Sequence, residues 1–129
     1  MGSKRYTLGK DERLSRKRSI DLLFEKGQSF IAFPLRVIYL PTEDDTPTPV
    51  SILINVSKKR FKHAVERNLL KRRVREAYRL HKYDLIDPLK EENRSMMVAF
   101  LYVDKEIHSF PSIEKAMTKA LRILRKKEL

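Results

Sequence analysis

The sequence predicts a single α+β domain in the order helix, strand, strand, strand, helix, strand, helix, with the helices packed against a mostly antiparallel sheet. The chain has 129 residues, 41% of them apolar, which is enough for one hydrophobic core and too few for two. Apolar residues alternate in some segments, as in strands, and recur three and four apart in others, as in helices. No repeat or low-complexity linker divides the chain, so we take residues 1–129 as one domain and expect residues 1–12 to be flexible.

The first predicted helix covers residues 16–26. It places Ile20, Leu23 and Phe24 at helical spacing. It is followed by Gly27, the residue type best suited to the left-handed position after a helix. The sequence therefore predicts a short helix with one apolar side.

Two or three strands are expected next. Residues 34–39 alternate, residues 29–33 could form a further short strand that bends away at Pro34, and residues 50–56 alternate with one clearly apolar face. The loop before residue 50 contains two prolines and three consecutive acids. For these acids a solvated turn is favoured over a magnesium site. They are Glu43, Asp44 and Asp45.

The second half of the chain predicts two helices and one buried strand. Residues 64–82 form the first of these helices, and residues 87–94 are interpreted as a connection because they contain Asp-Pro and a charged run. Residues 96–103 are apolar on both faces, which is typical of a strand covered on each side. Residues 113–124 follow the helical apolar series most closely and are followed by basic residues.

Positive charge is concentrated in one segment. The chain has 29 basic and 17 acidic residues, a formal net charge of +12 and a pI near 10.1. Residues 56–82 alone carry eleven basic and two acidic side chains. An anionic partner bound at a localised surface is therefore expected in preference to a generally basic exterior.

Wound as an α-helix, residues 64–82 separate into two faces. Leu70, Val74, Ala77 and Tyr78 form an apolar stripe suited to packing against a sheet. The second face carries Asn68, Lys71, Arg72, Arg75, Arg79 and Lys82. Its charges recur every four residues, roughly 6 Å apart along the axis, and like charges at that spacing destabilise an isolated helix. Such a row suits a nucleic-acid backbone, whereas an ordinary solvated face would mix both signs.

Several other classes of function are disfavoured. With no cysteine there is no disulfide framework, thiolate nucleophile or Cys-ligated zinc, which fits a reducing compartment. No apolar run approaches the roughly 18 residues of a membrane-spanning helix. The three histidines lack metal-ligand spacing. A protein nuclease using His63 and His81 is disfavoured because the helix would hold them about 27 Å apart.

The basic segment contains a recognisable motif. Residues 56–59 read Val-Ser-Lys-Lys, and residues 64–79 read Ala-Val-Glu-Arg-Asn-Leu-Leu-Lys-Arg-Arg-Val-Arg-Glu-Ala-Tyr-Arg. This resembles the signature of the bacterial ribonuclease P protein subunit, in which an Arg-Asn-Arg helix follows a strand that ends in a Ser/Ala-Lys-Lys turn. Arg13, Leu14, Phe24 and Gly27 also stand where that family has its first helix.

The resemblance implies a ribosomal protein S5 domain 2-like fold and an accessory subunit of an endoribonuclease whose chemistry is done by RNA. That enzyme removes the 5′ leader of precursor tRNA by hydrolysing one phosphodiester. The implied partners are the catalytic RNA and the leader. Mg²⁺ would be bound mainly by the RNA, and neither a protein catalytic residue nor an organic cofactor is expected. A monomeric, cytoplasmic protein without membrane contact is expected. Residues 1–12 are expected to be mobile until RNA binds, because Tyr6 is the only aromatic residue among them.

The resemblance also implies two groups of binding residues. The RNA-binding residues would be Lys58, Lys59, Arg60, Lys62, Arg67, Asn68, Lys71, Arg72, Arg75 and Arg79. A cleft between the first helix and the sheet would hold the leader, lined by Ile20, Phe24, Arg36 and Ile38.

Two residues depart from the family pattern. Leu69 replaces the second arginine of the motif, so that contact is either lost or supplied by Arg73. The cleft is aliphatic at Ile20 and Ile38, where relatives often have aromatics, so leader binding would depend less on base stacking. The alternative function is a ribosomal or other structural RNA-binding protein with no role in cleavage.

Overall fold

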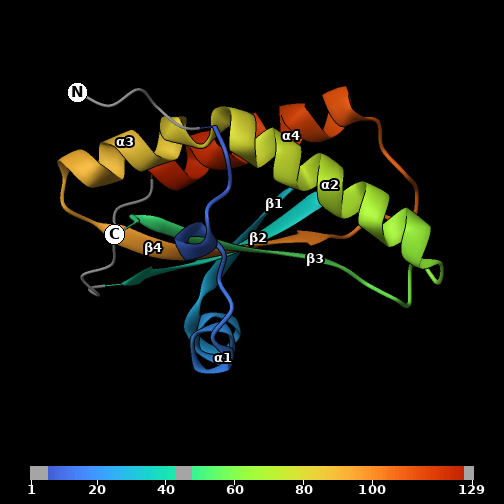
Figure 1. Cartoon of the computed structure of the whole chain (residues 1–129), viewed down its shortest axis with the longest axis horizontal. Coiled ribbons are helices and arrows are strands. Elements are labelled where there is room, and N and C mark those ends of the chain that lie inside the picture. Colours follow the sequence, from blue (N-terminus) through green and yellow to red (C-terminus); the bar gives the residue numbers. More distant parts are fainter. Residues whose placement is uncertain (1–5, 43–47, 127–129) are drawn as a thin grey trace.

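A computed structural model describes residues 6–42 and 48–126 of the chain. The elements are a 3₁₀ turn at Lys10–Glu12, α1 (Lys17–Lys26), β1 (Gln28–Ala32), β2 (Leu35–Thr42), β3 (Val50–Val56), α2 (Ala64–His81), α3 (Tyr83–Glu91), β4 (Ser95–Tyr102) and α4 (Phe110–Lys126). They form three layers (Figure 1): α2, α3 and α4 lie over one face of the sheet, and α1 lies against the other. The loop acids Glu43, Asp44 and Asp45 lie outside the described residues.

The sheet has four strands in the order β1-β2-β4-β3. β1 pairs with β2 and β2 with β4 in antiparallel fashion, whereas β3 pairs with β4 in parallel. The predicted α+β class with a mostly antiparallel sheet is therefore confirmed. Because Leu35, Tyr102 and Val56 stand in one row across the sheet, the β1–β2 turn and the carboxyl ends of β3 and β4 meet at the same end of the molecule.

Two apolar clusters hold the layers together. The larger lies between the sheet and α2, α3 and α4, and it contains the whole predicted stripe of α2, from Leu70 to Tyr78. The smaller lies under α1, where Leu23 packs with Ile38, Met97 and Ala99. Since strand side chains alternate between the two faces, the same strands supply both clusters.

The stretch predicted as a connection, residues 87–94, is in large part helical. α3 continues almost directly from α2 and buries Leu85, Ile86 and Leu89 against the core. Pro88 lies inside α3, where its missing N–H forgoes one helical hydrogen bond. Burial of three large side chains, each worth about 2 kcal/mol, outweighs that loss. The chain turns only at Asn93, whose φ of 56° is left-handed.

The sequence predicts a left-handed conformation at Gly27, and this prediction is wrong. A glycine is required here because a side chain would have no space. Its φ of −70° and ψ of 153° are ordinary extended values. A Cβ at this position would lie 2.4 Å from the Leu23 carbonyl oxygen and 2.8 Å from Cγ2 of Ile38. The glycine therefore lets α1 turn closely onto β2.

The N-terminal segment is attached to α2 by a buried ion pair. Lys82, predicted on the exposed basic face, is only 1% exposed, and its amine lies 2.8 Å from the Glu12 carboxylate. The same amine donates to the carbonyl oxygen of Thr7. Residues 6–12 thus have defined contacts within the stretch expected to be flexible, while residues 1–5 lie outside the described part of the chain, so the mobility of residues 1–12 before RNA binds stays a prediction.

We predict that Glu12→Gln destabilises the fold by about 3 kcal/mol, because it leaves the buried Lys82 charge without a counterion. Urea unfolding measures the change, with the exposed substitution Glu25→Gln as the matched control. Adding Lys82→Met to Glu12→Gln should recover most of the loss. Equal stability of Glu12→Gln and Glu25→Gln would show that the pair does not hold the segment.

Candidate nucleic-acid interface

The outward face of α2 carries the basic row that the sequence predicts. Asn68, Arg72 and Arg75 are exposed and Lys71 is partly exposed, because the opposite stripe of α2 is buried against the sheet. Among residues 6–42 and 48–126, the three cations have no ion pair or side-chain hydrogen bond. Their charges are available to an external anion.

Arg67, which precedes this row, and Arg79, near its end, are held by contacts within the chain. Arg67 donates through Nη1 to the carbonyl oxygens of Phe61 and Lys62, each at 2.8 Å. Arg79 pairs with Glu76 and donates to the Tyr6 carbonyl oxygen at 2.6 Å. The hydrogen bond from Arg79 lowers the pKa of Glu76, so this acid stays ionised and neutralises part of Arg79.

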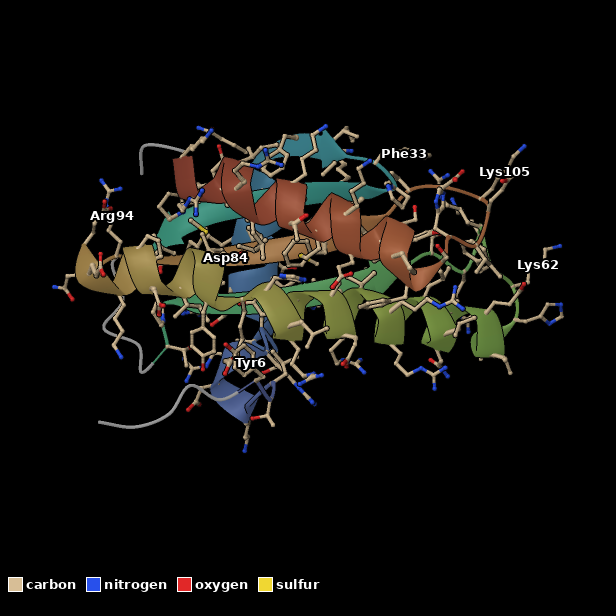
Figure 2. All side chains as sticks on the ribbon, turned by 90° about the horizontal axis from the view of Figure 1, so that it is seen from above. Tyr6, Phe33, Lys62, Asp84, Arg94 and Lys105 are labelled. Atoms are coloured by element: carbon tan, nitrogen blue, oxygen red, sulfur yellow. The ribbon has the colours of Figure 1, made fainter. Side chains whose placement is uncertain are left out.

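The predicted loop cations gather at one end of the molecule. Lys58, Lys59, Arg60 and Lys62 are all exposed in the segment between β3 and α2. The turn is closed by a hydrogen bond from the Lys59 N–H to Ser57 Oγ at 3.1 Å. Phe61 anchors the segment, packing 5.8 Å from the Tyr102 ring. In Figure 2, Lys62 and Lys105 lie at this end and Arg94 at the opposite one.

The four predicted cleft residues differ in accessibility. Phe24 is 45% exposed, Ile20 is partly exposed, and Arg36 is exposed with a 3.4 Å hydrogen bond to Ser29 Oγ. Ile38 is only 7% exposed beneath α1. Ile38 therefore supports the packing of α1 on the sheet. The accessible surface of the predicted cleft is formed by Ile20, Phe24 and Arg36.

Arg73 does not join the basic row in place of Leu69. Its Nη1 donates to the His108 carbonyl oxygen at 2.6 Å, toward the segment that precedes α4. His108 is fixed there by Asp104, and this hydrogen bond lowers the pKa of the Asp104 carboxyl. The guanidinium of Arg73 thus ties α2 to the β4–α4 connection, an arrangement that local sequence does not indicate.

The histidines are not assembled as a catalytic site. His63 precedes α2 and His81 ends it, where His81 lies 2.8 Å from the Glu114 carboxylate of α4. Within the described ranges, histidine, aspartate and glutamate side chains form no group of three that could hold a metal ion. No helix in this part of the chain is both long and apolar enough to cross a membrane.

Residues 8–125 match the sequence model of the family Ribonuclease P. The chain belongs to this family. It is 42% identical over 116 residues to the ribonuclease P protein component of Porphyromonas gingivalis strain ATCC 33277, covering 90% of this chain and 85% of that one. It is 37% identical over 127 residues to the component of Chlorobium phaeobacteroides, covering 92% and 86%.

Solved structures of the family share the fold. A ribonuclease P protein from Thermotoga maritima superposes with a TM-score of 0.68 at 24% identity, covering 92% of this chain and 99% of that one. A mutant of the Staphylococcus aureus protein gives 0.70 at 20% identity, covering 88% of each chain. The family match over residues 8–125 and the 42% identical relative show that the chain is a protein component of ribonuclease P, an RNA-binding accessory subunit of the tRNA-processing ribonucleoprotein enzyme, partnered by the ribonuclease P RNA. The alternative of a structural RNA-binding protein without a role in cleavage is not favoured.

Proposed function

We propose that this subunit binds the catalytic RNA through the outward face of α2 and the loop cations, and binds the 5′ leader of precursor tRNA beside α1. The single observation that supports the first contact is the row of Lys71, Arg72 and Arg75, three adjacent cations without an internal counterion. Phosphates would supply the missing counterions, with affinity gained from the release of condensed ions. The other RNA-binding residues would extend this contact along both ends of α2.

The chemistry would be done by RNA-bound Mg²⁺. Among the described residues, histidine and carboxylate side chains form no group of three that could hold a magnesium ion. The protein would instead raise the affinity for precursor and screen the repulsion between RNA segments, which lowers the magnesium requirement. We propose a monomeric protein in the cytoplasm, where the RNA and its precursor substrates are present.

Leader binding would depend on charge and apolar contact. Phe24 presents nearly half of its surface beside Ile20 on α1, and Arg36 is exposed on β2 of the sheet that α1 crosses. One aromatic ring can stack on an unpaired base, while the guanidinium can contact a phosphate. This group would distinguish precursor from mature tRNA, because only the precursor carries the leader.

Reconstitution tests the proposed function. The purified protein alone should cleave no precursor tRNA, and adding it to the cognate catalytic RNA should increase cleavage at low magnesium and tighten precursor binding. The measurement is single-turnover cleavage across a magnesium titration, with and without protein. Cleavage by the protein alone, or an unchanged magnesium requirement, would contradict the proposal.

We predict that Arg72→Gln weakens binding to the catalytic RNA roughly tenfold, the effect of losing one charge-assisted contact of about 1.5 kcal/mol. The slope of log affinity against log salt should fall by about 0.7 to 0.9. Arg122→Gln, an exposed arginine on α4, removes the same charge elsewhere and is the control. If both variants lose affinity equally, net charge and not the α2 row determines binding.

Phe24→Ala should weaken precursor binding by the holoenzyme several-fold and leave mature tRNA binding unchanged, because base–aromatic stacking contributes about 1 kcal/mol or more. Leu22→Ala, a second exposed apolar residue of α1, is the matched control. Binding of both RNAs is measured by titration of labelled RNA. An equal loss for precursor and mature tRNA would remove Phe24 from the leader site.

A further inference from the structure

A solvent-open pocket of about 160 Å³ lies between β3, the N-terminal segment and α2. In Figure 1 the N-terminal segment descends from α2 past β3 to α1. The apolar part of the lining is formed by Leu8, Leu14, Ile52, Leu53 and Ile54, and the charged part by Arg13 and Arg75. At about 30 Å³ for each water, the pocket has room for about five waters, which is more than a lone small ion needs.

The two arginines converge on this pocket without a counterion. Arg13 and Arg75 are both exposed, and neither has an ion pair or side-chain hydrogen bond with any residue in the described ranges. Two like charges beside one cavity repel each other and raise the local positive potential. An anionic group between them would relieve that repulsion.

The edge of β3 adds hydrogen-bonding groups to the pocket. The N-terminal segment pairs with β3 at Arg13 and Ile52, and the Leu14 N–H donates to the Ile52 carbonyl oxygen at 2.7 Å. The chain then departs to α1. Residues two apart on a strand direct their N–H and C=O to the same edge, so those of Ile54 point the same way as those of Ile52. In the part of the chain that the structure describes, no backbone or side-chain hydrogen bond reaches Ile54 at this edge.

We propose that this pocket binds one unpaired nucleotide of single-stranded RNA, with its phosphate between Arg13 and Arg75 and its base on the apolar lining. The base edge would pair with the N–H and C=O of Ile54, and the ring would lie against Leu8 and Leu14. The inference rests on the proposed function, since it assumes an RNA ligand. The nucleotide would come from the catalytic RNA or from the leader.

The pocket's position connects the two proposed RNA surfaces. Arg75 belongs to the outward row of α2, whereas Leu14 and Leu53 pack against the cluster beneath α1. An RNA strand passing from one surface to the other would cross the edge of β3 at this point. A peptide strand fits less well, because pairing with the N-terminal segment at Ile52 leaves only the last residues of β3 open.

A five-nucleotide single-stranded RNA is the first probe. Its titration should shift the NMR signals of the Ile54 amide and of the Leu8 and Leu14 methyls, and Arg13→Gln should weaken binding about tenfold. Arg122→Gln, the control of equal charge, should change affinity less than twofold, and Arg75→Gln is a second test variant. An oligomer of the same length without bases should bind more weakly and leave Ile54 unshifted. Equal binding of that oligomer would overturn the proposal, because the pocket would then recognise phosphate alone.

The holoenzyme identifies the source of the nucleotide. Weaker assembly of Arg13→Gln with the catalytic RNA alone assigns the nucleotide to that RNA, and weaker binding of precursor but not mature tRNA assigns it to the leader. A variant indistinguishable from Arg122→Gln in both assays overturns the proposal. If the wild-type chain fails to promote precursor cleavage but still binds the oligonucleotide at Ile54, the proposed function fails and the pocket assignment stands.

Discussion

The packing of one side of α2 on the sheet is the interaction on which the other features depend. Leu70, Val74, Ala77 and Tyr78 are all fully buried, and their burial sets the rotation of α2 about its own axis. At 100° per residue, fixing this stripe also fixes the direction of every other side chain on the helix. Lys71, Arg72 and Arg75 consequently face outward together, although none of them contributes to the core.

The N-terminal segment provides a second constraint, because it joins surfaces that the sheet would otherwise separate. The Glu12–Lys82 pair attaches it to the end of α2, and the backbone contact at Ile52 attaches it to the edge of β3. The chain then enters α1 on the opposite face of the sheet (Figure 1). The positions of α1 and α2 relative to one another are therefore set by side-chain and backbone contacts as well as by the sheet between them.

The parts of the fold that could be predicted are those that follow from the periodicity of apolar residues along the sequence. The stripe and the row of α2 are local consequences of helix geometry, and the alternation of residues 50–56 predicted β3. Lys82 was placed wrongly because its counterion, Glu12, is 70 residues away and no local pattern indicates the pair. The helix α3 was missed because Pro88 suggested a break, whereas burial of its neighbours against α4 overrides that preference.

For the candidate site too, local sequence predicts which side chains share a helix face, but not which distant groups they contact. Exposed cations such as Arg72 follow from the helical wheel, but Arg67 and Arg79 are held by carbonyl groups of Phe61, Lys62 and Tyr6 that only the folded chain brings near. The pocket at Ile54 is lined by the N-terminal segment, β3 and α2, which are distant from one another in sequence. Composition and motif predict which residues would meet RNA, whereas their division into free and internally bonded cations requires the tertiary structure.

The positive charges of the α2 row have two opposite effects. Their mutual repulsion opposes folding of the helix, and their attraction for anions favours binding of phosphates. Like charges four residues apart cost a helix roughly 0.2 to 0.5 kcal/mol per pair, and each buried side chain such as Leu70 or Val74 contributes about 2 kcal/mol in return. Apolar packing can therefore hold cations together without internal counterions. Phosphates bound along the row would remove the repulsion, so RNA binding at this face and the stability of α2 would be thermodynamically linked. The Glu76 carboxylate, by contrast, neutralises Arg79 internally, which leaves the middle of the row as its most electropositive part.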